Sequence, residues 1–118
     1  MKKPLAPKLD TRFVIQRDEA TPDWSGHPGE PDWQDQFTIW GNITFMRGGE
    51  AVIAARLTAR QPAILTVRVS SQTKTILPTD RVKNARTGEI FNIREQPRVS
   101  KDNRGYLEML VESGASDG

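Results

Sequence analysis

The sequence predicts a mostly β fold: a small six-stranded, partly open β-barrel or sandwich with one short inserted α-helix and a long first loop. Three observations lead to this prediction. Five segments alternate apolar and polar side chains with the two-residue period of a strand, whereas only one segment has helical spacing. Turn-forming residues separate these segments at short intervals. A length of 118 residues suits a single hydrophobic core.

The longest alternating segment, residues 33–45, organises the rest of the chain. Phe37, Ile39, Ile43 and Phe45 fall on one face of the expected strand, which we predict to be buried. Trp40 falls on the opposite face, where an indole requires a covering neighbour or a partner. The glycine that follows Trp40 indicates a bulge, a bend or a close backbone approach.

The remaining elements follow from the same patterns. A helix is predicted over residues 50–59, where Ile53 and Leu57 lie four positions apart on one helical face. Hairpin turns are predicted at 84–88 and 101–105, because both contain turn-forming residues between strand-like runs. The other five strands are expected at residues 12–17, 64–69, 81–83, 89–94 and 106–111.

The segment from residue 18 to residue 32 is predicted to be a long loop. It holds three prolines, two glycines and five acidic residues, and few of its residues could support a β ladder. Loops of this length are usually functional or disordered. Trp24 lies within it, and we expect its indole to fold back onto the barrel; the alternative is an anchor for another protein.

The chain is expected to form one domain, at residues 10–112, between a flexible N-terminal arm (1–9) and a flexible tail (113–118). The N-terminus carries lysines and prolines but no apolar segment typical of a secretory signal, so we expect synthesis in a cytoplasm. No apolar run approaches the roughly 20 residues that span a bilayer. The sequence contains no cysteine, which excludes disulfides and thiolate metal sites.

Charge is unevenly distributed. Residues 1–43 hold five Lys or Arg against seven Asp or Glu, whereas residues 44–104 hold twelve against five. Such asymmetry suits nucleic-acid contact or charge matching between neighbouring proteins, but a solvated basic face is an equally simple interpretation. A nucleic-acid-binding barrel would place aromatic side chains among the basic ones, and Phe45 and Phe91 instead fall in alternating runs that predict core positions.

No catalytic constellation can be assembled from the sequence. The single histidine, His27, lies in the proline-rich loop, and no His/Asp spacing resembles a metal site. Gly48 and Gly49 lack the Lys-Ser/Thr that completes a phosphate-binding loop. We therefore expect no enzyme, no metal and no cofactor.

The order of these elements resembles the bacteriophage head–tail joining family, also called head-closure or stopper proteins. The resemblance covers about residues 9–112 and depends on the order and spacing of several segments together. The first loop is richer in proline and acid than the family pattern, and Val69 stands where the family often has an aromatic residue. The segments that carry the resemblance are 13–17, 33 with 40–43, 49–50, 65–69, 80–82, 88–93 and 107–111.

The resemblance implies a small β-barrel that forms a ring, usually of six copies, at the head–tail connector of a virion or of a phage-like gene transfer agent. The implied partners are a portal–adaptor protein above, a tail terminator or tail protein below, and double-stranded DNA in the channel, with no membrane. A small basic nucleic-acid-binding barrel is the alternative function. The residues we predict to contact neighbouring subunits or partners are Asp23, Trp24, His27, Glu30, Arg47, Glu50, Arg56 and Arg60.

Overall fold

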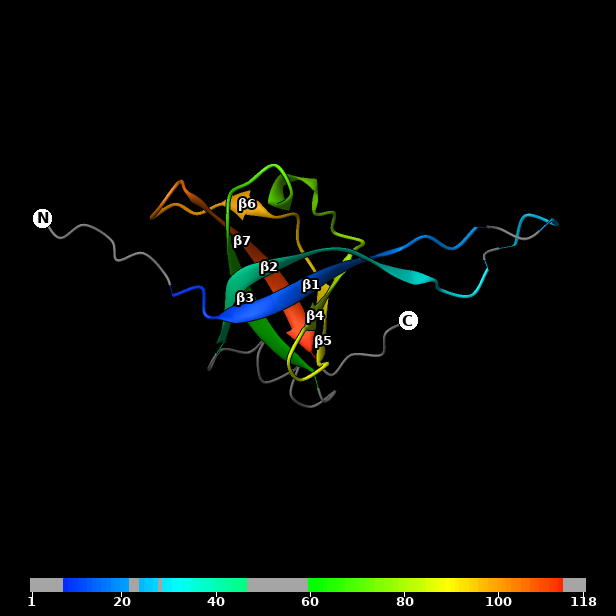
Figure 1. Cartoon of the computed structure of the whole chain (residues 1–118), viewed down its shortest axis with the longest axis horizontal. Coiled ribbons are helices and arrows are strands. Elements are labelled where there is room, and N and C mark those ends of the chain that lie inside the picture. Colours follow the sequence, from blue (N-terminus) through cyan, green and yellow to red (C-terminus); the bar gives the residue numbers. More distant parts are fainter. Residues whose placement is uncertain (1–7, 22–23, 28, 47–59, 114–118) are drawn as a thin grey trace, which may run out of the picture.

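The computed structural model describes residues 8–21, 24–27, 29–46 and 60–113. The predicted mostly β fold is confirmed (Figure 1). The helix predicted over residues 50–59 lies outside the described residues. The elements are β1 (Thr11–Asp18), β2 (Trp33–Phe45), β3 (Gln61–Arg68), the 3-10 turn η1 (Thr73–Thr75), β4 (Arg81–Asn84), β5 (Ile90–Ile93), β6 (Arg98–Val99) and β7 (Tyr106–Ser113).

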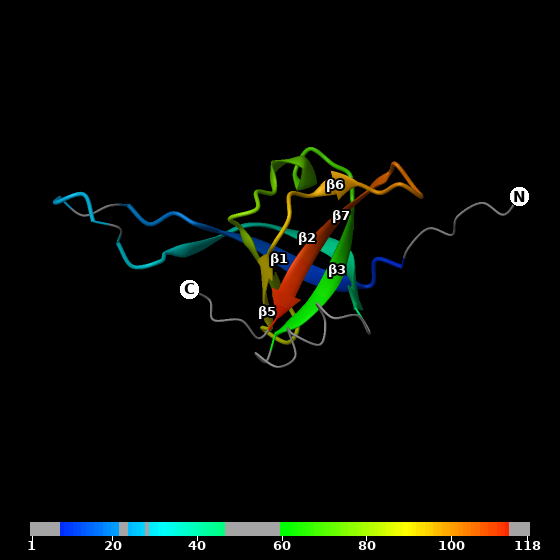
Figure 2. The ribbon, with the colours of Figure 1, turned by 180° about the vertical axis from the view of Figure 1, so that it is seen from behind.

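The strands form one antiparallel sheet in the order β3-β2-β1-β4-β5-β7-β6. Strand β3 also pairs with β7 along its whole length, from Gln61 opposite Ser113 to Arg68 opposite Tyr106, so the pairings close into a ring. Figure 2 shows β3 and β7 side by side on the face opposite β1 and β2. Each strand of the ring has a partner on both sides over part of its length, whereas residues 33–40 of β2 pair with β1 alone.

The core fills the inside of this ring. Phe13, Ile15, Leu65, Val82 and Phe91 are among the side chains with almost no exposed surface. They come from strands far apart in the sequence and lie at alternate positions, as a half-buried sheet requires. The ring of Phe91 meets that of Phe13 edge to face, with centroids 6.4 Å apart.

Strand β2 has the bounds predicted for it, but the face predicted to be buried is only partly covered. Phe37, Ile39 and Ile43 pack against the core, whereas Phe45 is 37% exposed and rests on Phe91, with ring centroids 6.3 Å apart. Of the bulge, bend or close backbone approach expected at Gly41, the structure shows the close approach. A Cβ there would lie 3.0 Å from Phe13 Cδ2 and 3.1 Å from the Thr66 carbonyl oxygen, and only glycine leaves that space.

Two elements were not predicted. The two-residue strand β6 pairs with β7 before the hairpin turn at 101–105, and it is too short to show any periodicity. The turn η1 is closed by side-chain hydrogen bonds between Ser70 and Thr73. The six predicted strands all exist, with ends shifted by at most three residues.

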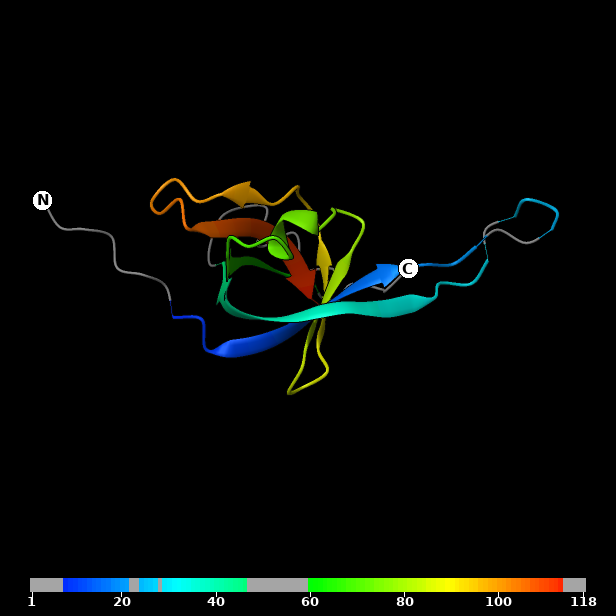
Figure 3. The ribbon, with the colours of Figure 1, turned by 45° about the horizontal axis from the view of Figure 1, so that its top comes forward.

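The ribbon of β1 and β2 continues beyond the ring as a projecting hairpin. Figures 1 and 3 show its loop extending away from all other strands, on the side opposite the start of β1. The projection makes the molecule elongated, with principal extents of 61 × 37 × 25 Å. The long loop predicted at residues 18–32 is therefore confirmed, and its position could not be read from the sequence.

Candidate functional site

The base of the projecting loop is closed by the carboxylate of Asp18. Its Oδ1 accepts hydrogen bonds from the backbone N–H groups of Ala20 and Asp32, both at 2.9 Å. The Glu19 N–H donates to the Asp32 carbonyl oxygen, also at 2.9 Å. These bonds join the two arms at the end of the β ladder and hold the loop in line with the ribbon.

The same hydrogen bonds set the ionisation of Asp18. The backbone donors of Asp32 and Ala20, followed by the positive charge of Arg81, lower the pKa of this carboxyl below its ordinary value. The carboxylate is therefore ionised at neutral pH. In this form it accepts both hydrogen bonds at the loop base.

The projecting loop presents an exposed aromatic side chain. Trp24 is 98% exposed, so the expectation that it folds back onto the barrel was wrong. The reason is geometric, because the hairpin carries the loop beyond the ring of strands. Ser25 Oγ lies 2.6 Å from His27 Nδ1, and Glu30 is exposed on the returning arm.

A second contact anchors the ribbon to the barrel one residue before the loop. Arg17 donates from Nε and Nη2 to the two carboxylate oxygens of Asp80, at 2.9 and 3.0 Å, and from Nη2 to the Thr75 carbonyl oxygen at 3.0 Å. The Asp80 side chain is fully buried and also accepts the Leu77 N–H at 2.9 Å. Hydrogen bonding to Asp80 raises the pKa of Arg17.

The outer face of the ribbon has its own polar network. Gln16 donates to Asp35 Oδ1 at 2.7 Å and accepts from Arg81 Nε at 2.8 Å. The Arg81 guanidinium lies 4.3 Å from the centroid of the Trp33 ring. Gln16 is almost fully buried although it faces outward, since these longer side chains cover it.

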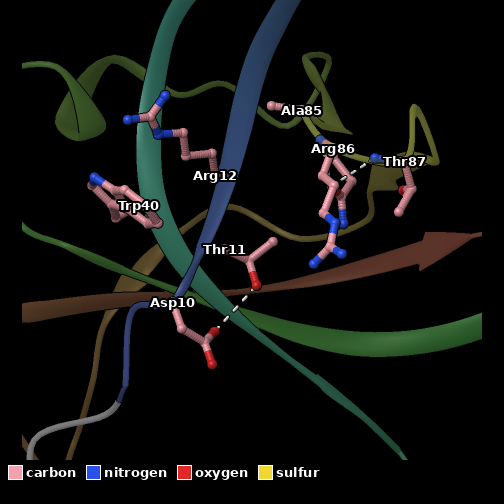
Figure 4. A pocket seen from close by; sticks show the side chains of 8 residues that line it. Asp10, Thr11, Arg12, Trp40, Ala85, Arg86 and Thr87 are labelled. Atoms are coloured by element: carbon pink, nitrogen blue, oxygen red, sulfur yellow. Dashed lines mark hydrogen bonds between the residues drawn. The ribbon is translucent and has the colours of Figure 1, made fainter.

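A similar pair marks the other end of the ribbon. The Arg12 guanidinium lies over the Trp40 ring, 4.9 Å from its centroid, and Trp40 remains half exposed. The neighbour expected for this outward indole is thus an arginine from the adjacent strand. Beside the pair is a surface pocket of about 610 Å³ between the start of β1 and the β4–β5 turn (Figure 4).

The structure brings together some of the predicted interface residues and separates others. Trp24, His27 and Glu30 gather on the projecting loop. Arg60 is exposed immediately before β3, which pairs with the far end of β2. Asp23, Arg47, Glu50 and Arg56 lie outside the described residues.

Sequence reasoning missed Asp18, the Arg17–Asp80 pair and Arg12. An aspartate at the start of a turn-rich segment is a signal for a side-chain-closed loop and could have identified Asp18. The partners in the pair are separated by 63 positions, so only the fold shows it.

Among the described residues, no group of three or more His, Cys, Asp or Glu side chains is placed to hold a metal ion. In the same part of the chain, no helix has the length and apolar character needed to cross a membrane. What the described surface offers is an exposed aromatic and acidic loop on a rigid ring of strands. This arrangement is typical of a structural protein that contacts other proteins through its loops.

The chain matches the family model of the phage head completion protein over residues 4–114. It therefore belongs to the phage head completion protein family and is a structural component of a phage-type virion. A search of curated proteins gives no match.

Two solved structures share the fold. The solution structure of protein SF1141 from Shigella flexneri 2a is 25% identical, with a TM-score of 0.64, over 92% of this chain and 95% of that one. A chain in the virion of a native gene transfer agent particle is 22% identical, with a TM-score of 0.64, over 91% of this chain and 96% of that one. At 22% identity, the likeness to the gene transfer agent chain is evidence of a shared fold.

Proposed function

We propose that the chain forms a ring at the connector between head and tail, where it closes the DNA-filled head and provides the surface to which the tail attaches. The observation that carries this proposal is the family match over residues 4–114, on a fold shared with a chain of a gene transfer agent virion. The proposed neighbours are a portal–adaptor protein on the head side and a tail terminator or tail protein on the other, with double-stranded DNA in a channel. A ring of six copies is the proposed assembly.

The projecting loop supports a role in contacting these neighbours. Its indole is almost completely exposed, and residues 18–32 carry five carboxylates and no Lys or Arg. An exposed tryptophan on an anchored hairpin is costly to leave in water and suits a partner contact. We propose that this loop, with Asp23, Trp24, His27 and Glu30, and the segment from Arg47 to Arg60 carry the contacts, while the strands hold them in place.

We propose that the free chain is monomeric or weakly associated and completes its ring only on the adaptor. The exposed large apolar side chains are scattered over several elements of the described surface, and polar contacts are individually weak. Light scattering of the purified chain at micromolar concentration is expected to give a mass near the 13.3 kDa of one copy. A stable hexamer that resists high salt would contradict this assembly route.

The function is tested by removing the chain from particles that contain it. Heads made without it are expected to remain unjoined to tails and to lose DNA, and added purified chain is expected to restore joining. The readout is the fraction of joined particles in electron micrographs. Joined, DNA-filled particles in the complete absence of the chain would overturn the proposal.

The outer face that carries Arg12, Trp40 and Arg86 favours one alternative, a small nucleic-acid-binding barrel. Direct binding to the DNA backbone would weaken by about 0.9 log units per log unit of salt for each phosphate neutralised. We expect weak binding, because closure of a head requires a narrowed channel and not DNA affinity. Tight duplex binding by the purified chain at physiological salt would favour the alternative.

A further inference from the structure

The pocket at the start of β1 is built from three segments that are tied together. Arg12 and Trp40 line one side, and the β4–β5 turn with Arg86 and Thr87 lines the other. Figure 4 shows Arg12 directed toward Trp40, with Arg86 and Thr87 across β1 from them. The Ala85 N–H donates to the Arg12 carbonyl oxygen at 3.0 Å, which fixes the turn against β1.

The turn itself is held in shape by Asn84. Its Oδ1 accepts the N–H groups of Arg86 and Thr87, at 2.9 and 3.2 Å, and its carbonyl oxygen accepts the Gly88 N–H at 2.8 Å. The volume of about 610 Å³ falls within the usual range for sites that bind small molecules or side chains, roughly 300 to 1,000 Å³. Hydrogen bonds therefore hold the backbone on the turn side of the pocket in place.

The pocket is positively charged and has an aromatic wall. Arg12 and Arg86 outnumber the single carboxylate of Asp10, which accepts a hydrogen bond from the Thr11 hydroxyl at 3.1 Å. Lys83, opposite Val14 in the register, adds a further positive charge to the same outer face. A ligand for this surface should combine carboxylates with an apolar or aromatic group.

The projecting loop of this same chain has that chemistry. It offers the exposed indole of Trp24 together with Glu30 and the other carboxylates of residues 18–32, and no Lys or Arg. A tryptophan buries about 150 to 250 Å² when it is covered, which is a large apolar contribution to a small contact. The charge of the loop is opposite to that of the pocket.

The loop cannot reach the pocket of its own copy. Arg12 is near the first residue of β1 and the loop begins after the last, so about 20 Å of extended strand separates them. The bonds of Asp18 direct the loop further away from the pocket, and Figure 1 shows the loop and the start of β1 on opposite sides of the ring. Contact between loop and pocket must therefore join two copies.

We propose that the Arg12–Trp40–Arg86 pocket receives the acidic loop of the neighbouring copy, with Trp24 against the pocket wall. The inference rests on the proposed ring and names the surfaces that join its subunits. Because the two surfaces lie at opposite ends of one ribbon, the contact is head-to-tail. Contacts of this kind close into a ring when the rotation between neighbours permits it.

The pocket is tested by titrating the full-length, ¹⁵N-labelled chain with a synthetic peptide of residues 18–32. The expected result is a shift of the Trp40 indole N–H signal and of the Arg86 and Thr87 amide signals. Arg86→Glu is expected to weaken binding by roughly threefold to tenfold, because it reverses an interfacial charge. Arg104→Glu, the same change in the exposed turn before β7, should leave binding unchanged.

Two outcomes of this titration would overturn the proposal. The peptide could leave the pocket signals unshifted at millimolar concentration, or it could shift a different surface. A short DNA duplex is titrated in parallel. If it shifts the same signals and binds more tightly than the peptide at physiological salt, the pocket is a phosphate site and not a loop receptor.

A second experiment keeps the loop on its own hairpin. The chain has no cysteine, so Glu30→Cys and Thr87→Cys each introduce a single thiol. Mixed under mild oxidation, the two variants are expected to form a disulfide-linked heterodimer about tenfold faster than Glu30→Cys mixed with the exposed control Lys101→Cys. Equal rates would overturn the inference. The proposed function would stand if particles still required the chain, and it would fail if they joined without it, whatever the cross-linking rates.

Discussion

The ion pair between Arg17 and Asp80 should stabilise the whole molecule, because it joins the root of the projecting hairpin to the barrel. Replacing Asp80 with alanine removes three hydrogen bonds, two from Arg17 and one from the Leu77 N–H. Breaking a fully buried pair costs about 3–5 kcal/mol, whereas a surface pair contributes about 0–1 kcal/mol.

The burial of the Arg17–Asp80 pair lies between these two cases. The Asp80 side chain is fully buried, but the Arg17 side chain is 31% exposed and can be rehydrated when its partner is lost. We therefore expect Asp80→Ala to lower the free energy of unfolding by about 2 kcal/mol, which for a chain of this size lowers Tm by roughly 8 °C. Because the pKa of Arg17 is raised, deprotonation of its guanidinium removes the contribution only as the pH rises from its ordinary pKa through the folded value.

The assay is a double-mutant cycle with Arg17→Ala, Asp80→Ala and the double variant, measured by urea unfolding. A coupling energy of at least about 1 kcal/mol is expected for the pair. The control cycle uses Glu95 and Arg98, an exposed pair three residues apart at 2.8 Å, for which we expect about 0–0.5 kcal/mol. A coupling energy for Arg17 and Asp80 no larger than that of the control would refute the reasoning.

Three further predictions concern the ribbon and its loop. Trp24→Ala should leave Tm unchanged, because the indole is 98% exposed, and should lower the yield of joined particles. A normal yield with both Trp24→Ala and Asp23→Lys would show that the loop is dispensable. Gly41→Ala should destabilise the fold by about 1–3 kcal/mol in urea unfolding, because its Cβ would crowd Phe13 and the Thr66 carbonyl; an unchanged midpoint would contradict the close approach. Since the folded pKa of Asp18 is lowered, its bonds at the loop base persist above the ordinary carboxyl pKa of about 4 and weaken as pH falls through the folded value. At neutral pH, the amide hydrogen exchange rates of Ala20 and Asp32 should be higher in Asp18→Asn than in the unaltered chain. Equal rates would argue against the role of the Asp18 carboxylate at the loop base.

Local patterns predicted the strands well, because period-two alternation reports directly on a sheet with one buried face. Strand β2 has the predicted bounds, and the glycine within it lies where the backbone of β3 passes closely. The turn at 84–88 was also predicted from local sequence, because its residues favour a tight reversal of the chain.

What the sequence could not predict depends on contacts between distant segments. The exposure of Trp24 follows from the projection of the hairpin beyond the ring, with the bonds of Asp18 and the Arg17–Asp80 pair at its base. The pocket beside Arg12 lies between the start of β1 and the β4–β5 turn, which are distant in the sequence and joined by the bond from the Ala85 N–H to the Arg12 carbonyl oxygen. An amphipathic pattern identifies the buried face of a strand but does not show which neighbour covers its outer face.

The central claim is that this chain closes the head at its junction with the tail. A focused electron cryo-microscopy reconstruction of the neck of particles that contain it tests the claim most directly. We predict a ring of copies of this β fold between adaptor and tail, each with its projecting loop against the Arg12–Trp40 end of the next copy. A neck without this fold, or the same fold found only at the tail tip, would contradict it.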